Sequence, residues 1–241
     1  EQMRVVDMSV WPPRVVSSFE GGGHGVDRAT INGAPFLLHS DETSQDQGQA
    51  ESIRASGCAP YEATPAAGAA EAFLTDISDE TAPARVSTLS LAINEPEHCD
   101  AHAQSAVNST IHYHEVDNPN DTTFAMLSMK NAGLRVFDVR NPEAPTEVAY
   151  FNPAMVGGSF DRARMHPHYD AATGHIWATT ERGGFWVLEL EPQVRAALGL
   201  PATENQFPNG RPARPPAPSA LSFTRPALTA TSPDLDLYCE V

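Results

Sequence analysis

The feature that most constrains the fold is a short pattern that occurs four times along the chain. In two copies an apolar run ends in Asp plus an apolar residue, and a proline follows seven residues after the Asp, before a second alternating segment. These copies read AFLTDISDETAPARVSTL at 72–89 and LRVFDVRNPEAPTEVAYF at 134–151. A third copy, RVVDMSVWPPRVVSSF, stands near the start with a linker one residue shorter, and a fourth, WVLELEP at 186–192, carries Glu189 in place of the Asp. Such self-similarity predicts a repeat architecture.

A second pattern precedes each copy except the one near the start of the chain. It consists of a His-bearing segment, a turn and an apolar segment, and the three examples read HGVDRAT-ING-APFLLHSDE, IHYHEVD-NPND-TTFAMLSMK and ARMHPHYD-AATG-HIWATTE. Each turn contains Asn, Gly or Pro, which suit tight hairpins. Four hairpin-linked strands in a unit of roughly 40 to 50 residues are typical of a β-propeller blade. We therefore expect an all-β fold, a β-propeller of four-stranded antiparallel blades, with a β-sandwich as the alternative.

The repeat count divides the chain into two parts. Residues 1–200 hold about three and a half blades. The half blade is residues 1–19, which form its two outer strands. An insertion rich in Ala, Gly, Ser and acidic residues lies at 42–70. The segment VRAALGL at 194–200 predicts a short helix, and 201–241 form a Pro/Ala-rich extended C-terminal segment packing on the propeller. Because propellers carry about four to eight blades, we expect another part of the polypeptide, or another chain in a larger surface assembly, to complete the ring.

The repeat also resembles a known family. The segments GLRVFDVRNPEAPTEVAYFNP (133–153) and GGFWVLELEPQ (183–193), with VVDMSVWPPRVVSSFEGGGHGV near the start, are similar to the LVIVD-repeat family of bacterial exported β-propeller proteins. The likeness covers about residues 4–40, 71–95 and 111–200, and is absent from the insertion and the C-terminal segment. It implies a ring of about seven blades in a secreted, periplasmic or cell-surface protein. It implies no reaction, because this fold hosts many functions.

Charge and hydropathy exclude two classes of partner. The chain has 31 Asp and Glu against 15 Lys and Arg, a formal net charge of −16, and a phosphate-binding protein needs clustered cations. No stretch approaches the roughly 20 apolar residues of a membrane helix. We therefore expect no nucleic acid partner and no membrane insertion. The sequence begins without an initiator Met or a targeting segment, so we expect a processed or truncated polypeptide.

The three cysteines, Cys58, Cys99 and Cys239, lack the spacing of zinc-binding or redox motifs. A disulfide between Cys58 and Cys99 and a fully reduced chain both remain open. In the first case Cys239 is left free or bonded to a partner outside this chain.

The histidines are the residues most suited to chemistry. His24, His112 and His166 fall near the start of the predicted innermost strand of successive blades, where equivalent positions converge on the propeller axis. Residues two apart on a strand share a face, so His114 and His168 extend the group. The sequence therefore predicts a candidate metal set consisting of His24, His112, His114, His166 and His168.

Imidazole ligands suit a transition metal such as Zn or Cu, with Asp27, Glu115 and Asp170 as further ligands or as groups that orient the rings. In the alternative interpretation no metal binds, and each His forms a hydrogen bond to the neighbouring blade. A different role is expected for Asp7 and its repeat equivalents Asp76 and Asp138, which should accept backbone hydrogen bonds at the turn to the next strand.

Two functional hypotheses follow. The first is an exported or cell-surface binding or assembly module that contacts a protein partner through loops, chiefly 42–70 and 94–110, because loops on a rigid scaffold usually carry binding. The second is a metal-dependent enzyme, an oxidoreductase or a hydrolase/lyase, that uses the His cluster. The chain contains no GxSxG hydrolase motif, and its catalytic residues stay unassigned.

Overall fold

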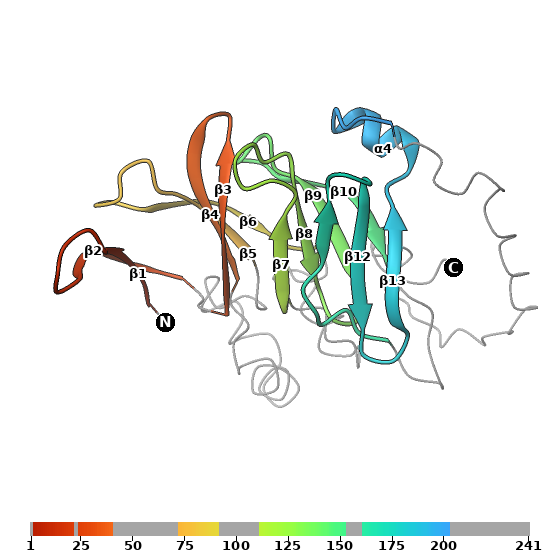
Figure 1. The fold of residues 1–241 in the computed structure, drawn as a ribbon, viewed down its shortest axis with the longest axis horizontal. Coiled ribbons are helices and arrows are strands. Elements are labelled where there is room, and N and C mark those ends of the chain that lie inside the picture. The colour runs from red at the N-terminus through yellow and green to blue at the C-terminus, as the bar shows by residue number, and fades with distance from the viewer. Residues whose placement is uncertain (1, 22–23, 41–71, 92–110, 153–160, 203–241) are drawn as a thin grey trace, which may run out of the picture.

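A computed structural model describes residues 2–21, 24–40, 72–91, 111–152 and 161–202. These residues form four antiparallel sheets, here named A to D in chain order, and one short helix (Figure 1). Sheet A contains β1 (Gln2–Asp7) and β2 (Arg14–Glu20). Sheet B contains, in spatial order, β3 (Gly25–Ile31), β4 (Ala34–Ser40), β5 (Ala72–Asp76) and β6 (Ala84–Leu89). Sheet C contains, in spatial order, β7 (Tyr113–Val116), β8 (Phe124–Ser128), β9 (Leu134–Asp138) and β10 (Thr146–Phe151). Sheet D contains β11 (His168–Asp170), β12 (His175–Thr180) and β13 (Gly184–Glu189).

The repeated hairpin of the sequence recurs in the structure with the same details in sheets A, B and C. In each, the Asp that ends the first strand accepts a hydrogen bond at Oδ1 from the backbone N–H two residues further on. The donors are Ser9 (2.9 Å), Ser78 (2.7 Å) and Arg140 (3.0 Å). The register also shifts between the residues one and two positions before that Asp in all three hairpins. The predicted turn role of these Asp residues is confirmed.

The turn between β3 and β4 also matches its sequence. Asn32 and Gly33 both have positive φ, 52° and 80°, which is the backbone geometry of a two-residue type I′ hairpin and the reason that Asn-Gly favours it. This turn sets the register of the β3–β4 pair, in which Ile31 lies opposite Ala34.

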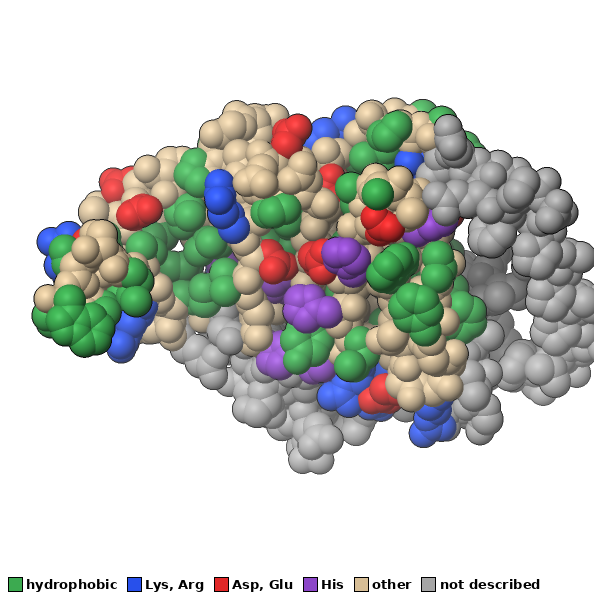
Figure 2. All heavy atoms as spheres, viewed as in Figure 1, with side chains coloured by type: hydrophobic (Ala, Val, Ile, Leu, Met, Phe, Trp, Pro, Cys, Tyr) green, Lys and Arg blue, Asp and Glu red, His purple; other side chains and the backbone are tan. Residues whose placement is uncertain are grey.

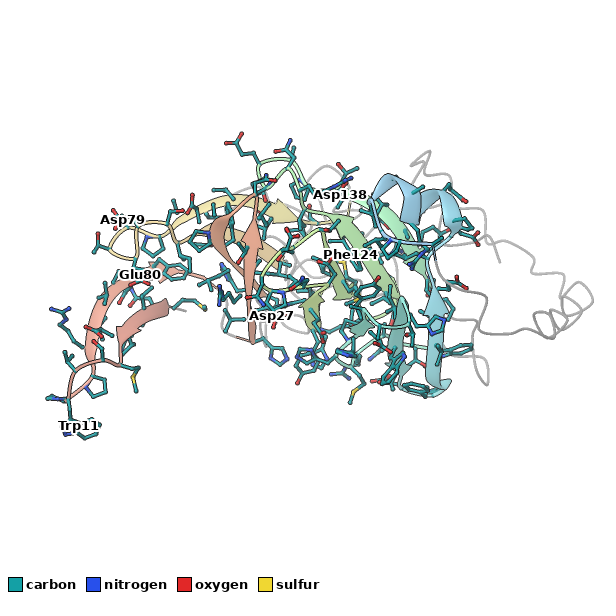
Figure 3. The ribbon with its side chains drawn as sticks, turned by 45° about the horizontal axis from the view of Figure 1, so that its top comes forward. Trp11, Asp27, Asp79, Glu80, Phe124 and Asp138 are labelled. Atoms are coloured by element: carbon teal, nitrogen blue, oxygen red, sulfur yellow. The ribbon has the colours of Figure 1, made fainter. Side chains whose placement is uncertain are left out.

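Sheet C lies between sheets B and D (Figure 1), and its two central strands, β8 and β9, are buried on both faces. Because successive side chains point to opposite faces of a strand, alternate residues of β8 and β9 belong to two separate cores. The core shared with sheet B contains Ala125, Leu127 and Phe137. The core shared with sheet D contains Phe124, Met126, Leu134 and Val136, with Tyr169 and Ile176 from sheet D. Figure 3 shows Phe124 within the body of the molecule.

Sheet D departs from the predicted four strands, because three are present among the described residues. After β13 the chain enters the helix α4 (Pro192–Ala197), close to the helix expected at 194–200. Glu189 stands at the position of the turn-forming Asp, and its longer side chain is not of the Asx-turn type that closes the other three hairpins. Pro192 then lies in the first turn of α4, a position that proline favours.

The all-β class and the antiparallel sheets are confirmed, while the closed ring of blades stays a prediction. The insertion at 42–70, nearly all of the C-terminal segment and the three cysteines lie outside the described residues. None of the helices described here has the length and apolar character to cross a bilayer.

Truncating Phe124 should test the packing of sheet C on sheet D. This side chain is fully buried and its ring lies 5.0 Å from that of Tyr169. We expect Phe124→Ala to lower the free energy of unfolding by about 3–5 kcal/mol, the usual loss for a buried Phe. Phe185→Ala, on the exposed face of sheet D, should change it by less than about 1 kcal/mol. Urea denaturation of both variants measures the two changes in the free energy of unfolding. Equal losses would contradict this packing of sheet C on sheet D.

Candidate functional site

The first strands of sheets B, C and D lie next to one another, because β7 contacts β3 on one side and β11 on the other. This arrangement gathers the histidines of three sheets along one edge. His24 N–H donates to Ser40 O (3.2 Å), and His112 N–H donates to Ser128 O (2.8 Å). The two residues therefore hold equivalent positions at the start of β3 and β7, as the sequence alignment predicts. His166 lies two residues before β11 begins.

Tyr113 is the centre of a cluster formed by these three histidines. Its ring centroid lies 4.8 Å from that of His24, 4.3 Å from that of His112 and 4.7 Å from that of His166. The rings of His24 and His112 stack at 4.8 Å with an interplanar angle of 27°. Figure 2 shows several histidines together on this face, next to acidic side chains. The structure thus brings the three predicted residues together, but around a tyrosine that the sequence analysis did not single out.

The other two histidines of the predicted set form cross-sheet pairs with carboxylates. His114 Nδ1 on β7 lies 2.8 Å from Asp27 Oδ2 on β3, and His168 Nδ1 on β11 lies 2.8 Å from Glu115 Oε1 on β7. The His114 side chain is buried, whereas that of His168 is 56% exposed. In both pairs a carboxylate of one sheet holds a histidine of the next, as expected for groups that orient the rings.

Asp170, the third expected partner, does not orient a histidine. Its carboxylate accepts hydrogen bonds from the backbone N–H of Ala172 (3.0 Å) and the hydroxyl of Thr173 (2.8 Å). The Thr173 hydrogen bond is the main cause of a lowered pKa at Asp170. Asp170 therefore closes the β11–β12 turn rather than extending the histidine site.

Gly25 allows His114 to approach β3 closely. A Cβ atom at Gly25 would lie 3.1 Å from His114 Nε2 and 3.6 Å from Ser40 Oγ. Both polar atoms are buried, and neither has a hydrogen-bond partner among the described residues. Any larger residue at this position would press on the imidazole. The sequence signal for this contact was the glycine that follows His24.

The hydrogen bonds decide which nitrogen of a neutral ring carries the proton, because a nitrogen that faces an oxygen acceptor must be the protonated one. His114 and His168 use Nδ1 toward a carboxylate, and the Nδ1 of His112 contacts the carbonyl oxygen of Arg164. A histidine held in this way presents the lone pair of Nε2, which is the usual arrangement of a metal ligand or a general base.

Binding one metal ion also requires the lone pairs to converge. Within the described part of the chain, no group of three or more His, Cys, Asp or Glu residues is placed to hold one ion. The stacked rings of His24 and His112 are close to parallel, so their in-plane lone pairs do not point to a common centre. His114 Nε2 is buried against Gly25. This geometry favours hydrogen bonding between sheets, and the metal assignment stays a prediction.

A buried carboxylate that the sequence analysis missed joins the segment before sheet D to the end of β12 and the turn that follows it. Asp161 accepts hydrogen bonds from the Thr180 hydroxyl (2.5 Å) and from the backbone N–H groups of Arg182 (2.8 Å) and Gly183 (2.7 Å). It precedes the sheet by several residues and belongs to neither repeated pattern. Its role depends on the path of the chain before β11, for which the sequence offered no signal.

The outer face of sheet D carries a second feature absent from the prediction. The face turned to sheet C is buried, but on the opposite face Trp177, Phe185 and Val187 are 41%, 61% and 51% exposed. Trp177 lies opposite Val187 in the β12–β13 register, and its ring lies 6.2 Å from that of Phe185. Figure 2 shows hydrophobic side chains over β12 and β13. These three residues are called the outer apolar face.

Comparison with known proteins leaves the chain without an assigned family. No protein-family model matches it, and no curated protein matches it. The resemblance to the LVIVD-repeat family therefore stays a prediction.

A double-mutant cycle on Asp27 and His114 should show that their contact stabilises the packing of sheet B on sheet C. We expect Asp27→Asn and His114→Gln to couple by about 1 kcal/mol in the free energy of unfolding. The matched cycle on Glu115 and His168 should give a coupling of less than about 0.5 kcal/mol, because that pair is more exposed. Chemical denaturation of the seven proteins, which are the wild type, four single variants and two double variants, measures both coupling energies. Equal couplings would show that burial does not decide the strength.

The metal hypothesis predicts a stoichiometric transition metal in the purified, unstripped protein. Plasma mass spectrometry measures it, and His112→Ala and His166→Ala should then remove the metal, whereas the strand residue His175→Ala should retain it. A protein free of transition metal would contradict the hypothesis and leave the histidines as hydrogen-bonding and stacking groups.

Proposed function

We propose that this chain is part of an exported β-propeller that acts as a binding or assembly module. Two observations support the propeller arrangement. The first strands of sheets B, C and D follow one another in series, and the β1–β2, β5–β6 and β9–β10 hairpins share their turn and their register shift. Export rests on the family resemblance.

The outer apolar face is the single observation that carries the binding role. Sheet C covers the corresponding apolar face of sheet B, and sheet D covers that of sheet C. Sheet D presents Trp177, Phe185 and Val187 to solvent. In a repeat protein each unit buries its apolar face on its neighbour, so the partner is a further sheet that packs on this face. The loop contacts expected at 42–70 and 94–110 lie outside the described residues and remain predictions.

The arrangement of the histidines also fits a binding role better than an enzymatic one. His114 and His168 direct Nδ1 to a carboxylate of a neighbouring sheet, and His112 directs Nδ1 to a carbonyl oxygen in the segment that precedes sheet D. Such bonds fix the relative position of the sheets, which a rigid binding scaffold requires.

Self-association should reveal the outer apolar face. When the covering sheet is absent, two copies should associate reversibly through this face, because exposed apolar area favours burial. Analytical ultracentrifugation over a range of concentrations measures this association. Phe185→Ser combined with Val187→Ser should abolish it, while Met8→Ser with Val10→Ser, which removes comparably exposed side chains from the β1–β2 turn, should leave it unchanged. A wild-type protein that stays monomeric at all concentrations, or association that persists in the Phe185 and Val187 variant, would overturn the proposal.

A further inference from the structure

We infer that the open edge of β1 binds an antiparallel β-hairpin of this repeat, which completes sheet A as a four-stranded sheet. The inference rests on the proposed assembly function and names a second surface, at the opposite end of the series of sheets from the outer apolar face. It follows from comparing sheet A with its two complete equivalents.

The β1–β2 hairpin is equivalent to β5–β6 and β9–β10 because all three share the Asp turn and the register shift. In the complete sheets, the strand equivalent to β1 is paired on both sides: β5 lies between β4 and β6, and β9 lies between β8 and β10. Among the described residues, β1 pairs with β2 alone. Sheet A therefore contains the third and fourth strands of the unit, and no described residues form its first and second strands.

The side chains around this edge are also more exposed than their equivalents in the complete sheets. All residues of β5 and β9 except the final Asp are buried, whereas β1 alternates between exposed and half-buried positions. Val26, on the first strand of sheet B, is 52% exposed. The equivalent position on β7 is His114, which is buried against sheet B. A hairpin paired to β1 would lie beside Val26 and cover it.

Sheet A contacts sheet B through β2, so these contacts do not use the backbone of β1. The Ser17 hydroxyl on β2 donates to the carbonyl oxygen of Glu80 in the β5–β6 turn (2.6 Å), and the ring of Phe19 lies 5.9 Å from that of His39. Figure 3 shows Glu80 next to the β1–β2 hairpin. These contacts attach the β1–β2 hairpin to sheet B, and the inner strand β3 keeps an exposed residue, Val26.

The β1 edge also lacks the usual protection against strand pairing. Native edge strands are commonly blocked by prolines or by several charges. The sequence of β1, QMRVVD, contains no proline and has one basic residue before the terminal Asp. Its backbone can therefore pair along the whole strand, which is the mode of strand addition to a sheet edge.

The repeat fixes the register of the incoming hairpin. In sheet B, Leu38 of β4 lies opposite Leu74 of β5. Leu74 stands two residues before the turn Asp, and the residue two before Asp7 is Val5. The hairpin residue equivalent to Leu38 should therefore lie opposite Val5, and its neighbour equivalent to Leu37 should point to the other face of the sheet.

The occupant is a further copy of the repeated hairpin, because those that the structure describes are already paired in other sheets. The described hairpins with the required sequence pattern are β3–β4, β7–β8 and β11–β12, which already form the first two strands of sheets B, C and D. A second copy could donate one only by withdrawing strands whose buried residues, such as Leu38 and Leu127, belong to its own core. That exchange would expose the core it leaves.

Disulfide trapping with a peptide of residues 24–40, the hairpin of sheet B, tests the edge. The protein carries Val5→Cys, with its three native cysteines changed to Ser and with Phe185→Ser and Val187→Ser to suppress association through the outer apolar face. We expect a peptide with Leu38→Cys to form the mixed disulfide at least about ten-fold faster than one with Leu37→Cys, because only the first is held at high effective concentration. A protein with Val15→Cys on β2, the outermost position of the unit, should show no preference between the peptides.

Hydrogen exchange on the unmodified protein provides a second measurement that does not depend on the variants. The unlabelled 24–40 peptide should slow exchange of β1 amides and leave β6 amides unchanged. Equal trapping rates for the two peptides, together with unprotected β1 amides, would overturn the inference while leaving the ultracentrifugation result for the outer apolar face intact. Disulfide dimers of the Val5→Cys protein that form faster than the peptide adduct would also overturn it, in favour of a second copy at this edge.

Discussion

The structure depends on the burial of two apolar faces by each central sheet. Sheet C shows the constraint most clearly, since Leu127 packs against sheet B and its neighbour Met126 packs against sheet D. Exposing either face of β8 or β9 to water would lose the burial of several apolar side chains, so sheet C requires a neighbour on both sides. The same requirement supports our proposal that a further sheet packs on the outer apolar face, because that face of sheet D lacks the cover that sheets B and C have.

Polar contacts along the first strands of sheets B, C and D add positional specificity to this apolar packing. The His114 and Asp27 pair and the His168 and Glu115 pair each join neighbouring sheets, and the rings around Tyr113 bring three sheets to one place. Hydrogen bonds have strict distance and angle requirements, whereas the hydrophobic contribution is non-directional and depends mainly on the area buried. The histidines therefore act on the relative position of the sheets more directly than on the amount of buried area.

Much of the fold was predictable because its signals are local. The Asp-based turn is closed within a few residues, and the Asn32-Gly33 turn depends on backbone conformations that these two residues favour. The recurrence of these turns also placed His24 and His112 at equivalent positions. Tyr113, Asp161 and the pairing of Asp27 with His114 were not predictable in the same way, because their partners come from another sheet or from a loop outside the repeat.

The sequence by itself determined the all-β class, the repeated unit and the positions of its turns, since alternation and turn chemistry act between residues close in the chain. Only the tertiary structure decided which histidine nitrogen faces which sheet, and which apolar residues are covered. Val187 and Val136 are alike in sequence terms, but Val136 lies beneath sheet D and Val187 lies on its far side. The difference arises from the order of the sheets in space, because a strand pattern specifies that a face is apolar and not which neighbour covers it.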